Sequence, residues 1–319
     1  MTDAAFCHTF IVVSVWDDHP APAQNHFARM KKTRMALHRR TLLAAGPLLA
    51  AWPRTAAAAP EPLGAYERAS GGRVGVYARN VATGATLAWR PDERFVMCST
   101  FKASLAALVL TRVDRGSDGL DRLISYTDAD LLEYAPVARE HLAKGALSVG
   151  EMCKAAVELS DNTCANLLLA RVGGPAALTA FWRSTGDAVS RLDHDEPLLN
   201  RTPPGRDDDT TTPAGMAGNL RRFVLGDVLS AASRAHFTGW LLGCQTGGNR
   251  LRAGVPPGWR IGDKTGNNGN DAAGDIAVIW PPSAGPLVVC AYTRGGSPTA
   301  PQLLTLFTDL GRLVARQLV

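Results

Sequence analysis

Histidines, aromatic residues and long apolar runs are all scarce in this chain of 319 residues. Aromatic residues make up 7% of it, and only three histidines follow residue 59: His141, His194 and His236. The five cysteines after that point (98, 153, 164, 244 and 290) have no metal-binding spacing, so we expect no metal and no cofactor. No apolar run in the same part of the chain is long enough to cross a membrane.

The rest of the composition is that of an ordinary globular protein. With 46% apolar and 20% charged residues, it excludes a disordered, collagen-like or polytopic membrane protein. Residues 1–59 hold seven of the 34 basic and three of the 29 acidic residues, so 27 basic and 26 acidic residues remain in 60–319. Because this part is nearly neutral, we expect no nucleic-acid partner.

Residues 1–59 are predicted to be a leader and are excluded from the fold. Arg39 and Arg40 precede a short apolar segment and a run of alanines that ends at Pro60. This pattern is typical of a signal peptide, and the paired arginines favour the twin-arginine route. We therefore expect an exported, periplasmic protein without membrane attachment; the alternative is an arginine-flanked apolar helix. Two upstream methionines are alternative start sites, Met30 and Met35.

Hydrophobic periodicity places strands at both ends of the remaining chain and helices between them. Strands are predicted at 74–78, 86–89, 260–264, 275–280 and 287–292. Helices are predicted at 99–113, 148–159, 162–172, 212–225 and 302–317. Residues 196–212, rich in proline and acidic residues, are predicted to form a long surface loop.

This order predicts an α/β (α+β) fold with a five-stranded antiparallel sheet flanked by helices and an inserted all-α lobe. Consecutive strands with short connections pair antiparallel. We divide the chain into the leader 1–59, a discontinuous α/β domain of 60–98 and 243–319, and an all-α domain of 99–242. Clefts between lobes favour small ligands, so we expect the active site at the lobe interface.

Ser99-Thr-Phe-Lys102 stands at the predicted start of the first long helix. Residues three apart share a helix face, and a serine in the first turn meets the positive helix end. Lys102 can lower the proton affinity of the Ser99 hydroxyl or accept its proton, which predicts an activated nucleophile. The alternative is an exposed helix start, because such a pair also arises by chance.

Ser160-Asp-Asn162 lies at a predicted helix junction. Ser160 is a candidate proton relay, and the Asn162 amide can bind a substrate. The alternative is a simple helix cap, because serine, aspartate and asparagine all favour that position.

Lys264-Thr-Gly266 ends a predicted strand. Lys264 and Thr265 can bind a carboxylate, and Gly266 permits close backbone approach. The alternative is a strand end with a turn glycine.

In this order, the three motifs resemble the signature set of class A β-lactamases and penicillin-binding proteins. The resemblance extends from about residue 61 to the C-terminus. It implies a serine hydrolase that opens β-lactam rings through an acyl-enzyme and so confers antibiotic resistance. The base that activates Ser99 is left open between Lys102 and Glu196 acting through water.

Glu196-Pro-Leu-Leu-Asn200 distinguishes the members of this superfamily. By resemblance, Glu196 and Asn200 hold the hydrolytic water, and Asn166 supports their loop. A carboxylate near an ester and a water is a general base. The alternative for Glu196 is a solvated loop acid.

Further site residues follow from the resemblance alone. Arg250 matches the arginine that helps Lys264 and Thr265 hold the substrate carboxylate; a surface arginine is the alternative. Tyr134 matches an aromatic at the cleft entrance, with a core tyrosine as the alternative. The backbone N–H of Asn267 is expected to complete an oxyanion hole with that of Ser99.

The sequence also departs from the family pattern. His194 stands where many relatives have an arginine that pairs with an aspartate, here Asp209. Because histidine is mostly neutral at pH 7, we expect a weaker contact, a more mobile loop and broader substrate acceptance. Cys98 cannot form the bridge of some carbapenem-hydrolysing relatives, whose partner position is Asn268. Cys153 is likewise expected to be free, because its usual partner position holds Ala106.

Two other functions share most of these residues. A D-Ala-D-Ala carboxypeptidase of the penicillin-binding type does not need the Glu196 motif. A β-lactam sensor domain needs slow deacylation and a membrane relay.

The resemblance to class A β-lactamases also implies that the protein is a monomer.

Overall fold

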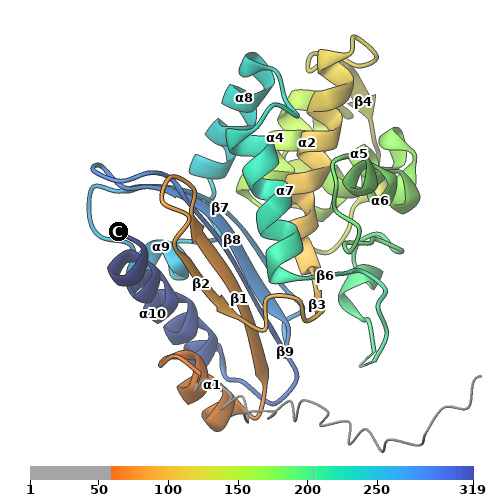
Figure 1. The fold of residues 1–319 in the computed structure, drawn as a ribbon. Coiled ribbons are helices and arrows are strands. Elements are labelled where there is room, and N and C mark those ends of the chain that lie inside the picture. Colours follow the sequence, from red (N-terminus) through yellow and green to blue (C-terminus); the bar gives the residue numbers. More distant parts are fainter. Residues whose placement is uncertain (1–58, 204) are drawn as a thin grey trace, which may run out of the picture. The chain divides into compact units, whose positions relative to one another are not determined.

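The computed structural model describes residues 59–203 and 205–319, and its centre is a five-stranded antiparallel sheet (Figure 1). The strand order is β2-β1-β9-β8-β7. The strand bounds are β1 Arg73–Asn80, β2 Thr86–Trp89, β7 Arg260–Asn267, β8 Ala273–Trp280 and β9 Leu287–Arg294. The predicted sheet and its antiparallel pairing are therefore confirmed, with most strands longer than the sequence pattern indicated.

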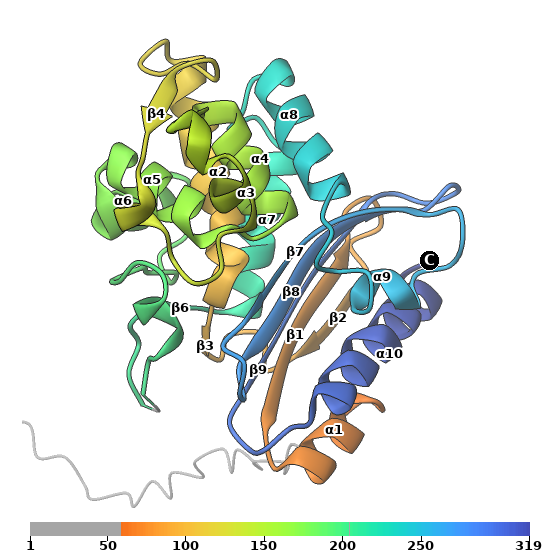
Figure 2. The same cartoon turned by 180° about the vertical axis from the view of Figure 1, so that it is seen from behind.

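Helices cover both faces of the sheet (Figures 1 and 2). One face packs against α1 (Leu63–Ser70) and α10 (Ala300–Leu318), which come from opposite ends of the described chain. The other face packs against a helical lobe. Because both faces are covered, β8 and β9 are buried at almost every position, and their sequences are nearly continuous apolar runs.

The helical lobe lies between the two groups of strands in the sequence. Its longer helices are α2 Phe101–Asp114, α4 Val149–Glu158, α5 Asn162–Val172, α6 Gly174–Ser184, α7 Pro213–Leu225 and α8 Ala231–Leu242. Local capping signals explain several of their starts. Ser148 and Glu151 form a capping box before α4, and Thr212 caps α7, in which Pro213 is the first residue.

Shorter elements connect these parts. The short helices are η1 Cys98–Thr100, η2 Asp128–Asp130, α3 Pro136–Glu140, η3 Leu142–Lys144, η4 Leu198–Asn200 and α9 Leu251–Gly254. Two small pairs of strands are β3 Phe95–Val96 with β6 Thr210–Thr211, and β4 Leu123–Ser125 with β5 Ala146–Ser148. The β3–β6 pair ties the end of the predicted surface loop to the segment before Ser99.

Two hydrophobic clusters fill the two sides of the sheet. The larger joins the helical lobe to one sheet face and includes Phe101, Trp182 and Tyr292. The smaller joins α1 and α10 to the other face and includes Leu63 and Phe307. The lobe and one face of the sheet thus share one continuous core, and β7 packs against η1 and α8.

The predicted leader up to residue 58 and Cys7 lie outside the described residues. Among the described residues, no single helix is long and apolar enough to span a membrane; only the bent pair α5 and α6 passes that test jointly. The five cysteines in the described part of the chain are all buried and free. The predictions for Cys98 and Cys153 are confirmed in that respect.

Candidate active site

The candidate nucleophile lies where the helical lobe meets the sheet. Ser99 is the middle residue of η1, which runs directly into α2. Its hydroxyl donates a hydrogen bond to Glu196 Oε1 at 2.8 Å and accepts one from Lys102 Nζ at 2.9 Å. Cys98 before it has a positive φ of 45°, a backbone conformation that side chains disfavour and that is common at functional sites. The predicted pairing of Ser99 with Lys102 on one helix face is confirmed.

Lys102 is fully buried and surrounded by oxygen atoms. Its Nζ is 2.8 Å from Ser160 O, 2.5 Å from Asn162 Oδ1 and 3.0 Å from Glu196 Oε1. Burial lowers the pKa of Lys102, although the Glu196 carboxylate acts in the opposite direction. A lysine whose pKa is lowered in this way is better able to accept a proton from a hydroxyl.

Ser160 lies at the junction of α4 and α5, as its motif predicted. Its φ is 60°, and its hydroxyl lies 3.4 Å from Lys102 Nζ and 3.1 Å from Lys264 Nζ. The helix cap is a neighbouring residue, Asp161, which accepts a hydrogen bond from Cys164 N. The two interpretations of the motif are therefore divided between adjacent residues: Asp161 caps the helix, and Ser160 lies between two lysines.

Lys264 and Thr265 lie on β7, the edge strand beside the lobe. Lys264 is fully buried and also donates to Thr265 O at 2.7 Å. Burial lowers the pKa of Lys264 to about 7, and the positive charge of Lys102 adds to this effect. The Thr265 hydroxyl is 2.5 Å from that of Thr246.

Gly266 brings β7 against the nucleophile. A Cβ atom at this position would lie 2.9 Å from both Ser99 N and Met97 O, which is closer than real Cβ atoms come. Only glycine therefore fits here. Asn267 follows as the last residue of β7 and is exposed. This close approach places the Ser99 backbone beside the end of β7.

Glu196 is buried and held from three directions. Its backbone N–H and C=O pair with the Asn166 side chain at 3.0 and 2.9 Å, and its Oε2 accepts a hydrogen bond from Asn200 Nδ2 at 2.7 Å. Burial alone raises the pKa of Glu196, but Lys102 and the hydrogen bonds from Ser99 and Asn200 outweigh it, so the pKa is lowered. Glu196 is 3% exposed, so the alternative of a solvated loop acid is wrong. The predicted support by Asn166 is confirmed.

Arg250 and Tyr134 lie at the margin of this group. Arg250 donates to the carbonyl oxygens of Gly266 at 3.0 Å and Gly274 at 2.7 Å, and its guanidinium stacks on the Phe307 ring. It is therefore fixed at the ends of β7 and β8 and is not a free surface arginine. Tyr134 is 50% exposed, which excludes a core tyrosine.

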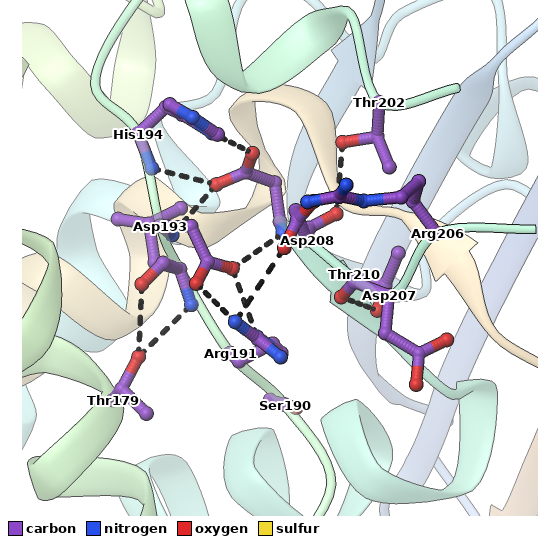
Figure 3. Close-up of polar contacts among 12 residues, drawn as sticks. Thr179, Ser190, Arg191, Asp193, His194, Thr202, Arg206, Asp207, Asp208 and Thr210 are labelled. Atoms are coloured by element: carbon purple, nitrogen blue, oxygen red, sulfur yellow. Dashed lines mark hydrogen bonds and ion pairs between the residues drawn. The ribbon is translucent and has the colours of Figure 1, made fainter.

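The loop that carries Glu196 closes at a charged neck (Figure 3). Asp209 Oδ1 accepts the backbone N–H groups of Asp193 and His194 at 2.8 and 2.9 Å, and Asp209 Oδ2 lies 2.7 Å from His194 Nδ1. The hydrogen bond with Asp209 raises the pKa of His194. The expectation that His194 is mostly neutral is therefore corrected, because Asp209 favours the protonated ring. Arg191 and Asp208 extend the neck on its outer side.

Sequence reasoning missed Thr246 and the role of Asp161. Asp161 Oδ2 also accepts the N–H groups of Val137 and Ala138, so it anchors the segment that carries Tyr134. The position of Asp161 inside the Ser160-Asp-Asn162 motif was the sequence signal that could have indicated this role. Thr246 precedes the glycines before Arg250, but its contact with Thr265 links distant parts of the sequence and needs the fold to be known.

Comparison with known proteins now decides the family. The model of the β-lactamase enzyme family matches residues 61–318. A curated relative, β-lactamase L2 of Stenotrophomonas maltophilia, is 48% identical over 275 residues, which cover 86% of this chain and 90% of the relative. The chain belongs to the β-lactamase enzyme family.

Solved structures of class A β-lactamases share this fold. A reconstructed ancestral class A β-lactamase of Gram-negative bacteria is 53% identical, with a TM-score of 0.77, over 80% of this chain and 97% of that chain. The putative class A β-lactamase PenP from Rhodopseudomonas palustris is 50% identical, with a TM-score of 0.77, over 79% of this chain and 96% of that chain. This β-lactamase is thus of class A, as its motifs indicated.

Proposed function

We propose that this chain hydrolyses the β-lactam ring of penicillin- and cephalosporin-type antibiotics through an acyl-enzyme on Ser99, and so confers resistance. One observation supports this above the others. The Ser99 hydroxyl is within hydrogen-bond distance of both Lys102 at 2.9 Å and Glu196 at 2.8 Å. A nucleophile with two possible bases beside it can be both esterified and released.

In the first step, Ser99 Oγ bonds to the β-lactam carbonyl carbon, and the carbon–nitrogen bond of the ring then breaks. The hydroxyl proton passes to Lys102 or, through water, to Glu196. Ser160 gives a proton to the departing nitrogen and recovers one from Lys102, whose Nζ lies 3.4 Å from its hydroxyl. Where Glu196 takes the Ser99 proton, it passes that proton on to Lys102, whose Nζ is 3.0 Å from Glu196 Oε1, so protons are conserved over the step on either route.

Groups at the end of β7 bind the negatively charged parts of the substrate. The backbone N–H groups of Ser99 and Asn267 bind the oxyanion of the tetrahedral intermediate, in a position that Gly266 makes possible. Lys264, together with Thr265, binds the carboxylate that these antibiotics carry, and Arg250 supports it from the ends of β7 and β8. Two residues line the acyl side of the cleft, Asn162 and Tyr134.

In the second step, Glu196 takes a proton from a water, whose oxygen bonds to the ester carbonyl carbon. The bond from that carbon to Ser99 Oγ then breaks, and Ser99 Oγ recovers the proton from Glu196, whose Oε1 lies 2.8 Å away. Asn200 holds Glu196 Oε2 at 2.7 Å, and among the described residues Asn200 Oδ1 has no protein partner, so it can accept from that water. Neither a carboxypeptidase of the penicillin-binding type nor a β-lactam sensor needs the Glu196–Asn200 pair. The Glu196–Asn200 contact therefore favours a hydrolase.

Stopped-flow kinetics on a chromogenic cephalosporin test the proposal. A hydrolase gives sustained turnover, and an intact-mass measurement finds a transient adduct on Ser99. One stoichiometric burst followed by very slow turnover would instead favour a penicillin-binding protein or a sensor. Absence of any adduct, with Ser99→Ala equal to wild type, would reject the serine mechanism.

The leader motif also supports export to the periplasm by the twin-arginine route, followed by removal of the signal peptide. The resemblance to class A β-lactamases supports a monomer. The same proposal includes the division into a discontinuous α/β domain and an all-α domain at residues 98/99 and 242/243. Cell fractionation, with Arg39→Lys and Arg40→Lys together as the export-blocking variant, tests the route. Gel filtration with light scattering tests the oligomeric state.

A further inference from the structure

Two buried aspartates lie next to each other on the face of the sheet that turns away from Ser160. Asp263 on β7 and Asp275 on β8 are both 0% exposed. In the antiparallel register Thr265 is opposite Asp275, so Asp263 and Asp275 are diagonal neighbours on one face. Lys264, between the two β7 positions, points to the other face. Two residues of α9 contact the aspartates: Leu251 contacts Asp275, and Arg252 contacts Asp263. Figure 2 shows α9 beside β7 and β8.

Each carboxyl group has one paired and one unpaired oxygen. Asp263 Oδ1 pairs with the Arg252 guanidinium, and Asp275 Oδ2 accepts from Leu251 N at 3.1 Å. Within residues 59–203 and 205–319, the other two oxygens, Asp263 Oδ2 and Asp275 Oδ1, are buried without a hydrogen-bond partner. A buried, unpaired carboxylate oxygen is costly. A single proton between these two oxygens would give both of them a partner.

The charges around the pair indicate which aspartate carries that proton. Burial raises the pKa of Asp275 well above its ordinary range, and the charge of Asp263 raises it further, against the opposing effect of Arg250. Asp263 has Arg252 directly bound and is the better site for the negative charge. Burial raises the pKa of Asp263, but the Cys244 side chain and the charge of Lys264 both lower it, which favours the ionised form. The other titratable groups near Asp275 are Cys290 and Tyr292.

We propose that Asp275 is a protonated carboxyl group that donates its hydrogen to Asp263, and that this pair positions Arg250 for substrate binding. Leu251 is held by Asp275 and Arg252 by Asp263, so both residues after Arg250 are fixed to the sheet. The role of Arg250 rests on the proposed function, whereas the shared proton does not.

Infrared spectroscopy tests the proton directly. At about neutral pH, the wild-type protein is expected to show the C=O stretch of a protonated carboxyl group, and Asp275→Asn is expected to lack it. Asp309→Asn, at a partly exposed position on α10 where the carboxylate pairs with Arg312, is the control and keeps the band. Absence of the band from the wild type, or its persistence in Asp275→Asn, would overturn the proposal. If the variant does not fold, absence of the band from the wild type still overturns the proposal.

Thermal unfolding gives a second test, for which the proposal predicts the direction of the change in melting temperature with pH. An aspartate ionises near pH 3.9 in the unfolded chain, so a carboxyl that stays protonated when folded makes the wild type lose stability as pH rises above about 4. The Asp275→Asn variant has no such loss of stability, because asparagine does not ionise. The melting temperature of Asp275→Asn relative to wild type should therefore rise between about pH 5 and about pH 8. A difference in melting temperature that stays constant or falls over that range would show that Asp275 is already ionised in the folded protein and would overturn the proposal.

The positioning role has its own kinetic test. Asp275→Ala removes the anchor of Leu251 and should raise KM for a carboxylate-bearing cephalosporin about five-fold, with kcat nearly unchanged, from the loss of about one hydrogen bond. Asp275→Asn keeps both hydrogen bonds and should restore KM. Equal losses on a substrate whose carboxylate is esterified would reject positioning through Arg250. If the wild type hydrolyses no β-lactam, the proposed function fails, while the infrared and thermal tests still decide the shared proton.

Discussion

The group of side chains around Ser99 and the loop neck both contain charged side chains, but they differ in burial. Lys102, Glu196 and Lys264 are at most 3% exposed, whereas the side chains of Arg191 and His194 in the neck are 41% and 48% exposed. Buried charges need partners and change their pKa values, while exposed ion pairs contribute little to stability. We therefore expect large, chemically specific effects from substitutions in the first region and small effects in the second.

The largest effect is expected at the buried carboxylate. Glu196→Gln keeps the size of the side chain but removes the base, so kcat should fall about 10²- to 10⁴-fold with accumulation of the acyl-enzyme. Burst kinetics and intact mass measure both. Asp195→Asn, at the exposed neighbouring position, is the control and should remain close to wild type. Rapid turnover by Glu196→Gln would contradict the assigned role.

The next effect concerns the support of that carboxylate. Asn166→Ala leaves the Glu196 backbone N–H and C=O without their partners, so we expect a loss of about 1–3 kcal/mol in stability. We also expect kcat to fall about ten-fold or more, because the base is displaced. Thermal unfolding and steady-state kinetics measure these losses. Asn249→Ala, at an exposed position, is the control. Unchanged deacylation in Asn166→Ala would show that the loop positions Glu196 by other contacts.

The pH dependence of kcat/KM tests the lowered pKa of Lys264. With a pKa of about 7 in the free enzyme, Lys264 loses its positive charge as pH rises through that value. If the charge binds the substrate carboxylate, kcat/KM should fall above that point by about ten-fold per pH unit. Lys264→Arg should have a lower plateau but no such fall, because arginine stays charged. A flat wild-type profile up to about pH 9 would contradict the interpretation.

The smallest effect is expected in the neck. Because its pKa is raised, the contact of His194 with Asp209 is fully present below the ordinary value of 6.5 and is lost as pH rises through the raised value. His194→Arg should remove this dependence, with a change below about 1 kcal/mol because the ring is half exposed. Hydrogen exchange of residues 196–203, at acidic and alkaline pH, measures it.

The same variant tests the expected breadth of substrate acceptance. If the histidine makes the loop more mobile, His194→Arg should narrow the range of β-lactams accepted, measured as kcat/KM on a panel of small and bulky acyl side chains. Equal exchange and equal selectivity in the two proteins would remove the link between the neck and specificity.

Local sequence signals predicted most of the fold, and the motifs predicted which side chains the structure brings together around Ser99. The Ser148–Glu151 box and Pro213 marked helix starts because capping depends on neighbours in the chain. The β3–β6 pair could not be predicted, because each strand has only two residues and its partner is distant in sequence. The proximity of Asp263 to Asp275 could not be predicted for a similar reason, because it depends on the register between β7 and β8.

The free thiols of the described cysteines have a consequence for handling this enzyme. Since all five are buried and none is in a disulfide bond, covalent cross-links contribute nothing to the stability of the described part of the chain. Burial also raises the pKa of Cys98 and Cys153, which suppresses the reactive thiolate. The folded enzyme should therefore tolerate both reductants and mild alkylating agents, and its lifetime should be independent of the redox state of its surroundings.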